Sequence, residues 1–370
     1  MGLGIKTHLQ GFRRYRYLRT PAAWARARRP EAPLLRYIGW VGHRNIGDEA
    51  LFAAFRDHLF RRAFVLPYYD LSPLSVYGSF KRSRSVVLGG GTLINDDNYL
   101  VPLERGQGRG LRSYVFGTGV GDLSYWSAYD QPWRGNEDRW VRALKRASYV
   151  GVRGPRSLAW ARHHGIDTAE LVGDPALMLD VPPPPVPSAS RVCVGLNLGS
   201  HDPVQGGDAA LRSAVLEMVD LALSSRCRVR YLAMSPIDQA IGEELRKVFT
   251  SDDFELHEFS DDVDTLMSSL VGCDYVVAQR LHVTVLACSA GIPNLSLSYQ
   301  PKCLDFLESI GREDLAVQTQ DISAAILIDR FRWLQRHAGD LRREMEGACE
   351  VLRGRQRQAA ARVLADVCQS

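Results

Sequence analysis

The sequence has no run of 18 apolar residues, and no apolar stretch of the kind found in signal peptides stands near its beginning. Its seven cysteines are odd in number and include no C-x-x-C pair. A membrane-spanning segment, a disulfide scaffold and a zinc site are therefore not expected. The cysteines lie mostly in apolar surroundings, which indicates reduced core thiols in a cytoplasmic protein.

Charge is modest overall and unevenly placed. Charged residues make up 24% of the chain and hydrophobic residues 45%, which excludes disordered and fibrous classes. Residues 1–36 nevertheless hold nine basic residues against one acidic residue, a net charge of +8, so the remainder carries −4. A slightly acidic body argues against a nucleic-acid partner, whose binding face would be basic.

The basic stretch predicts an N-terminal arm, residues 1–35, that precedes the first domain. Its arginines alternate with aromatic residues, a composition suited to anionic lipid headgroups. We therefore predict peripheral contact of this arm with the inner face of the plasma membrane. A solvated tail fits the same composition equally well.

From residue 36 onward, short apolar runs that end in glycine alternate with helical patterns, which is typical of βα units on a parallel sheet. We predict an α/β protein with two Rossmann-like domains, residues 36–180 and 191–320. A proline-rich linker, 181–190, joins them, and C-terminal helices follow at 321–370. Ligands bind at the carboxyl ends of parallel strands, so two such sheets are expected to face a cleft, as in GT-B-like enzymes.

Two motifs of the first domain follow strands. "GHRNIGDEAL" places Asn45 and Asp48 at a turn that opens a helix, where such residues are also common caps. "LGGGTLIND" offers the backbone of Gly90 and Gly91 and the hydroxyl of Thr92 to a ligand. The glycine run lacks both the P-loop lysine and the G-x-G-x-x-G spacing, so it is a weak signal alone.

Three arginines or lysines stand at further strand ends. Arg153 follows an apolar strand and is expected to point into the crevice, unless it pairs with Asp174. Arg280 and His282 alternate along another strand end, and Lys302 follows Pro301 after the next strand. Several cations at one cleft repel one another unless an anion binds, so a small, multiply charged anion is the predicted ligand.

In order and spacing, these motifs resemble the polysaccharide pyruvyl transferase family. The resemblance rests on "N-x-G-D-E-A-L", "GGG-T-L", "G-V-R-G-P-x-S", "G-D-P-A-L", "R-L-H" and "S-Y-x-P-K-x-x-x-F" over residues 38–310. It implies transfer of pyruvate from phosphoenolpyruvate to two sugar hydroxyls, forming a ketal, with no metal or cofactor. It also implies donor binding or catalysis by Arg153, Arg280, His282, Lys302 and Asp48. Many relatives carry aspartate where this chain has Gln300, which leaves the role of that side chain open.

A hypothesis consistent with both the residues and the resemblance assigns catalytic roles to His282 and Asp48. Cations hold the donor, His282 protonates its methylene carbon, and Asp48 deprotonates the attacking sugar hydroxyl. Asn45, Gly90, Gly91 and Thr92 complete the expected substrate-binding set. Two alternatives remain: a nucleotide-sugar glycosyltransferase of GT-B type, and a catalytically inactive binding protein of envelope assembly.

Overall fold

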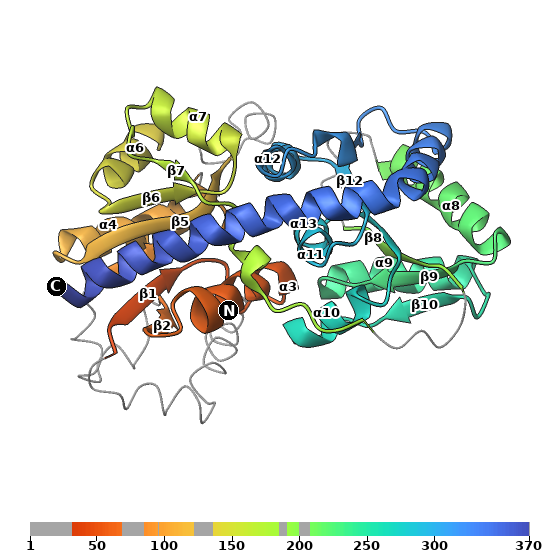
Figure 1. Ribbon diagram of the computed structural model, residues 1–370, viewed down its shortest axis with the longest axis horizontal. Helices are drawn as coiled ribbons and strands as arrows, with labels where there is room; N and C mark the ends of the chain where they lie inside the picture. The colour runs from red at the N-terminus through yellow and green to blue at the C-terminus, as the bar shows by residue number, and fades with distance from the viewer. Residues whose placement is uncertain are drawn as a thin grey trace, which may run out of the picture. The chain divides into compact units, whose positions relative to one another are not determined.

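The computed structural model describes residues 32–68, 85–94, 96–121, 136–184, 191–199 and 208–369. The predicted arm therefore lies almost entirely outside the described residues, as do residues 185–190 of the predicted linker. The chain divides into two compact units (Figure 1). Unit 1 comprises Met1–Met178 together with Leu352–Ser370, and unit 2 comprises Leu179–Val351.

Unit 1 is built on a seven-stranded parallel sheet in the order β2-β1-β3-β5-β6-β7, with β4 paired to β5. Among the described residues, helices occupy four of the connections between these strands: β1 to β2, β4 to β5, β5 to β6 and β6 to β7. The elements are β1 (Leu34–Ile38), α3 (Ile46–Ala53), the π-helix η2 (Ala54–Leu59), β2 (Phe64–Pro67), β3 (Ser85–Leu88), β4 (Gly91–Ile94), α4 (Asp97–Gly108), β5 (Arg112–Val120), α6 (Glu137–Lys145), β6 (Tyr149–Val152), α7 (Pro155–His163), β7 (Glu170–Leu171) and the 3₁₀ turn η5 (Pro175–Met178).

Both faces of this sheet are covered by apolar side chains. One core cluster joins the strands to α3, η2 and the last turns of the C-terminal helix α13 (Ala324–Gln369), through residues such as Phe55, Phe116 and Val363. The other joins them to α4, α6 and α7, through residues such as Leu103, Trp140 and Val152. Parallel strands buried on both faces read as continuous apolar runs, which is why the sequence predicts them well.

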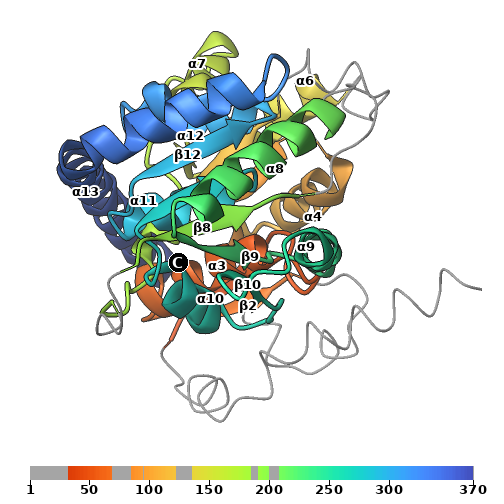
Figure 2. The ribbon, with the colours of Figure 1, turned by 90° about the vertical axis from the view of Figure 1, so that its right-hand side faces the viewer.

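Unit 2 contains a six-stranded parallel sheet in the order β10-β9-β8-β11-β12-β13, with helices packed around it (Figure 2). This is the Rossmann order 3-2-1-4-5-6. Its elements are β8 (Cys193–Asn197), α8 (Asp208–Ser224), β9 (Arg228–Leu232), α9 (Pro236–Val248), β10 (Phe254–His257), α10 (Val263–Leu270), β11 (Tyr275–Ala278), α11 (Leu281–Ser289), β12 (Asn294–Ser298), α12 (Pro301–Ser309), the 3₁₀ turn η7 (Glu313–Leu315), β13 (Ala316–Gln318) and the first part of α13.

The two sheets confirm the predicted α/β class with two Rossmann-like units. The C-terminal residues, expected as a segment of one or two helices from 321 to 370, form the single helix α13. Unit 2 contains this helix up to Val351 and unit 1 contains it from Leu352 onward. Among the described residues, no helix combines the length and the apolar composition needed to cross a bilayer.

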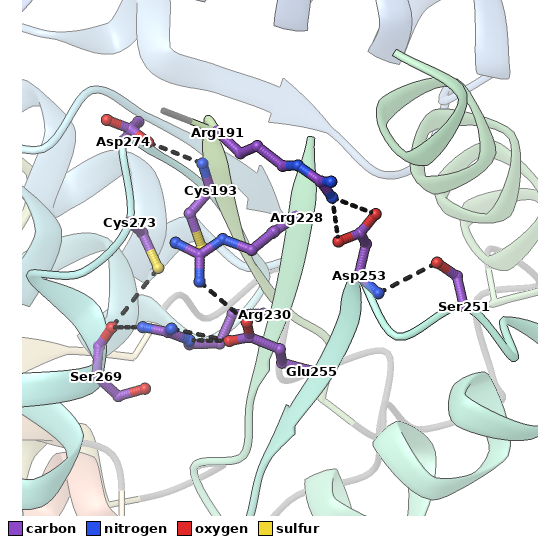
Figure 3. A network of polar contacts seen from close by, with 10 residues as sticks. All are labelled: Arg191, Cys193, Arg228, Arg230, Ser251, Asp253, Glu255, Ser269, Cys273 and Asp274. Carbon is purple, nitrogen blue, oxygen red and sulfur yellow. Dashed lines mark hydrogen bonds and ion pairs between the residues drawn. The ribbon is translucent and has the colours of Figure 1, made fainter. Parts of the chain in front are cut away.

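Charged side chains at the amino-terminal edge of the unit 2 sheet neutralise one another (Figure 3). Arg191 Nη1 lies 2.7 Å from Asp253 Oδ1, and Arg228 and Arg230 both pair with Glu255. The opposite, carboxyl-terminal edge of this sheet carries the residues predicted to bind a ligand.

All seven cysteines are free and six are buried, as the sequence predicts.

Candidate functional site

In unit 1 the strand order reverses between β1 and β3, the point where open parallel sheets bind ligands. Glycines follow β1 and β3 here because the ring of Tyr37 occupies the space that their side chains would need. A Cβ atom at Gly39 or Gly89 would lie 2.5 or 2.1 Å from a carbon of that ring. Burial, together with the nearby Asp48 and Asp174 carboxylates, raises the pKa of Tyr37 well above its usual value, so the phenol stays neutral.

Asn45 and Asp48 both lie at the start of α3. The Asn45 side chain caps this helix, accepting a hydrogen bond from Gly47 N at 3.2 Å, which is the capping role that its residue type allows. Asp48 lies in the first turn, and its Oδ1 is 3.8 Å from where a Cβ atom of Gly91 would stand. The neighbouring Glu49 is buried, and its Oε1 accepts from Gly42 N at 2.7 Å, which fixes the preceding loop.

Arg153 is fully buried at the end of β6. Its Nη2 lies 3.1 Å from Thr92 Oγ1, so the structure brings together two of the predicted residues. The guanidinium group packs against Gly119, where a Cβ atom would approach Nη2 to 2.5 Å. The positive charge of Arg153 also interacts with the Asp174 carboxylate. From the sequence, pairing with Asp174 is the alternative to a ligand-binding role for this arginine.

Asp174 is also fully buried, and burial raises the pKa of its carboxyl to about 6, although Arg153 acts to lower it. The folded protein therefore binds this proton more tightly than the unfolded chain does. The stability that this group contributes is complete below about pH 4 and is lost as the pH rises through about 6.

We expect Asp174→Asn to remove this pH dependence. Asparagine can still accept the hydrogen bond that Asp174 Oδ1 receives from Ala176 N. The difference in unfolding free energy between variant and wild type should change by roughly 3 kcal/mol between pH 4 and pH 7, as denaturant titrations at several pH values would show. The exposed Asp167→Asn in the same unit is the control. A difference that is constant with pH would contradict the prediction.

In unit 2 the strand order reverses between β8 and β11. Two side-chain hydrogen bonds join the loops that leave these strands. Asn197 Oδ1 accepts from Arg280 N at 2.9 Å, and Gln279 Oε1 accepts from Gly199 N at 2.8 Å. They fix the backbone at the reversal point and so fix the position of Arg280.

The Arg280 side chain is held by a carboxylate that no sequence motif had indicated. Asp238, at the start of α9, is fully buried; its Oδ1 lies 2.6 Å from Arg280 Nη2 and its Oδ2 lies 3.1 Å from Nε. Hydrogen bonding and charge from Asp238 raise the pKa of Arg280, although burial, the largest influence, acts to lower it. Nη1 forms no hydrogen bond or ion pair with the residues that the structure describes, so this edge of the fork is available.

Gly199 allows this placement. A Cβ atom there would lie 2.5 Å from Arg280 Nε and 2.9 Å from its Cζ. Arg280 and Arg153 therefore share one arrangement, in which a guanidinium group packs on a glycine and interacts with a buried aspartate.

Gly199→Ala is expected to lower the unfolding free energy of unit 2 by about 1–3 kcal/mol, because the new methyl group forces Arg280 away from Asp238. Thermal and denaturant unfolding would measure the change. Gly347→Ala is the control, since a Cβ atom at this helical position meets nothing within 4 Å and should stabilise by about 0.5–1 kcal/mol. Equal stability of Gly199→Ala and wild type would contradict the close packing.

The sequence predicts that His282 continues the strand, because it alternates with Arg280. The structure shows that this prediction is wrong. Strand β11 ends at Ala278, Arg280 is the extended N-cap residue, and His282 lies in the first turn of α11. Its ring is half-buried, with Nε2 inside. The change of register matters little for the site, because the helix begins at the same edge of the sheet.

Lys302 lies after β12, the parallel neighbour of β11, and Pro301 begins α12 as the sequence predicts. Its Nζ lies 5.1 Å from the ring centroid of the buried Tyr299. It forms no ion pair with the described residues. Gln300 is the N-cap residue of α12. The residues at the carboxyl edge of the unit 2 sheet thus include Arg280, His282 and Lys302, and those at the carboxyl edge of the unit 1 sheet include Asp48, Gly90, Gly91, Thr92 and Arg153.

Several solved structures share this fold. The chain is similar to a putative UDP-N-acetylglucosamine 2-epimerase from Listeria monocytogenes, with 12% identity, a TM-score of 0.60, and coverage of 90% of this chain and 95% of that one. It is also similar to S. aureus MnaA with UDP, at 13% identity, TM-score 0.55, and 86% and 91% coverage. A UDP-glucosyltransferase from Polygonum tinctorium gives 12% identity, TM-score 0.55, and 92% and 99% coverage. The class is therefore a GT-B-like α/β protein.

The family is narrower than this fold class. The model for polysaccharide pyruvyl transferases matches residues 45–301, which contain nearly every motif described above. The chain belongs to the polysaccharide pyruvyl transferase family. No curated protein matches the chain.

Proposed function

We propose that this protein transfers the pyruvate unit of phosphoenolpyruvate to two hydroxyls of a sugar, forming a cyclic ketal on a cell-surface polysaccharide or its lipid-linked precursor. Family membership supports a transferase of polysaccharide biosynthesis. The observation that carries the choice of donor is the cationic carboxyl edge of unit 2. There Lys302 has no ion pair among the described residues, whereas arginines at the amino edge of the same sheet are paired with Asp253 and Glu255.

Phosphoenolpyruvate offers two anionic groups to such a surface. The outward edge of the Arg280 guanidinium suits a carboxylate or a phosphate oxygen, and the Lys302 ammonium acts as a point charge for phosphate. The N-terminus of α11, where His282 lies, adds backbone N–H groups and the positive end of the helix dipole. A bound dianion also favours the protonated imidazole, which the chemistry needs.

In the proposed reaction, His282 donates a proton to the methylene carbon, and the carbon that bears the phosphate becomes an oxocarbenium-like electrophile. A sugar hydroxyl adds to this carbon and loses its proton to a base, a role that the family resemblance gives to Asp48. Phosphate then leaves with its bonding electrons. The second hydroxyl adds to the same carbon and releases its proton, which closes the ring and gives ketal and phosphate in equal amounts.

A mass-spectrometric assay on sugar acceptors with phosphoenolpyruvate tests this proposal. The product should be heavier by pyruvic acid less one water, and one phosphate should be released for each ketal. Transfer from a UDP-sugar with release of UDP would instead support a GT-B glycosyltransferase. Failure to bind either donor would support an inactive binding protein of envelope assembly.

Lys302→Ala is expected to weaken phosphoenolpyruvate binding by about 10- to 100-fold, the effect of losing one charge-assisted contact. Isothermal titration of the donor without acceptor measures this change directly. Lys247→Ala, at an exposed position of α9, is the control for lost positive charge in the same unit. Unchanged affinity in Lys302→Ala would remove this ammonium from the donor site.

A further inference from the structure

A groove of about 450 Å³ lies in unit 1, away from the residues expected to bind the donor. Pro33, which directly precedes β1, forms part of its wall, as do Arg61 and Arg62, which precede β2. Because β1 and β2 are parallel neighbours, the groove lies at the amino-terminal edge of the sheet. The cluster around Asp48 and Gly90 follows the carboxyl ends of the same sheet, so the groove is a separate site.

The groove is strongly basic. Three arginines, Arg61, Arg62 and Arg357, and His58 line it, and no described aspartate or glutamate does. Arg61 and Arg62 are exposed, and neither forms a hydrogen bond or an ion pair with the described part of the chain. Arg61 and Arg62 are neighbours in the sequence and line the same groove, so both charges attract an anion that binds there.

The remaining wall is apolar. Leu59 and Met178 contribute to it, and so do small and aliphatic side chains of α13 such as Ala361 and Leu364. A small hydrated anion gains nothing from this surface, whereas an amphiphile with an anionic head does. Arginines above an apolar wall are also typical of surfaces that lie at the headgroup level of a membrane.

We infer that this groove binds anionic phospholipid headgroups and is the folded part of a membrane-contact surface. The chain supplies a second reason. Pro33 is in the wall, so the stretch of residues 1–36 with its net charge of +8 joins unit 1 at the groove. Attraction to an anionic leaflet adds for each nearby basic residue, so the basic composition of this stretch and the arginines of the groove favour the same kind of ligand.

Co-sedimentation of the full chain with vesicles tests the inference. The wild type should bind vesicles of phosphatidylcholine mixed with phosphatidylglycerol, release at high salt, and leave phosphatidylcholine vesicles unbound. Arg61→Gln with Arg62→Gln should lower the partition coefficient about 25-fold, since each basic residue near such a surface contributes about fivefold. Ala361→Glu, which places a carboxylate in the groove, should lower it independently.

Arg336→Gln with Arg342→Gln, two exposed positions of α13 in unit 2, is the charge-matched control and should change binding by less than about threefold. Circular dichroism verifies that every variant is folded. Wild-type binding by the Arg61 and Arg62 double variant, or equal binding of wild type to neutral vesicles, would overturn the inference. So would release by inorganic phosphate but not by chloride at equal ionic strength, because the groove would then recognise free phosphate. Donor binding does not depend on these residues, so the two proposals fail separately.

Discussion

Replacing His282 with glutamine is expected to lower turnover by about 10²- to 10⁴-fold, the usual contribution of a general acid. The imidazole lies in the first turn of α11, two residues after Arg280, which is the N-cap residue and which we propose binds the donor. Glutamine fills similar space and can form hydrogen bonds, but it has no proton to give at neutral pH. Phosphate release with donor and acceptor measures turnover, and titration measures affinity for phosphoenolpyruvate, which should change little.

His337→Gln, at an exposed position of α13, is the matched control and should be as active as the wild type. Full activity of His282→Gln would remove this residue from the mechanism. Loss of donor affinity with unchanged turnover at saturation would make it a binding residue instead.

Asp238→Asn is expected to have the largest effect on stability. The carboxylate is fully buried and neutralises Arg280 through Nε and Nη2. Breaking a buried pair costs about 3–5 kcal/mol, and the lower end applies because the Arg280 side chain is 23% exposed. Denaturant unfolding measures this loss. Phosphoenolpyruvate affinity should also fall, because Arg280 is no longer held in place.

A double variant separates the two effects. Asp238→Leu with Arg280→Met replaces the pair with apolar side chains, which is often close to neutral for stability. We expect most of the unfolding free energy to return while the affinity for the donor stays low. Asp264→Asn, an exposed acidic position in the same unit, is the control. Wild-type donor affinity in Asp238→Asn would show that Arg280 does not need this partner.

The sequence predicts the two sheets because their central strands are buried on both faces and therefore read as short apolar runs. It does not reveal the short edge strands β2, β7 and β13, whose two to four residues carry too little pattern. It places Arg280 and Lys302 just after strands correctly, since a strand followed at once by a helix leaves only a few residues between them, but it places His282 on the strand end when it lies in the first turn of α11.

Other parts of the site depend on contacts far apart in the chain. "SPID" reads as a helix start, and Ser235 does accept a hydrogen bond from Asp238 N at 3.3 Å. Nothing in that motif indicates that its aspartate pairs with an arginine 42 residues later. In the same way, Gly119 and Gly199 indicate a close approach of some group, but only the fold shows that the group is a guanidinium.

The packing of Arg153 on Gly119 and of Arg280 on Gly199 also constrains how the sequence can change over time. A side chain larger than hydrogen becomes tolerable at position 119 or 199 only after the facing guanidinium has been lost. Among related proteins, residue 119 should therefore vary together with residue 153, and residue 199 together with residue 280.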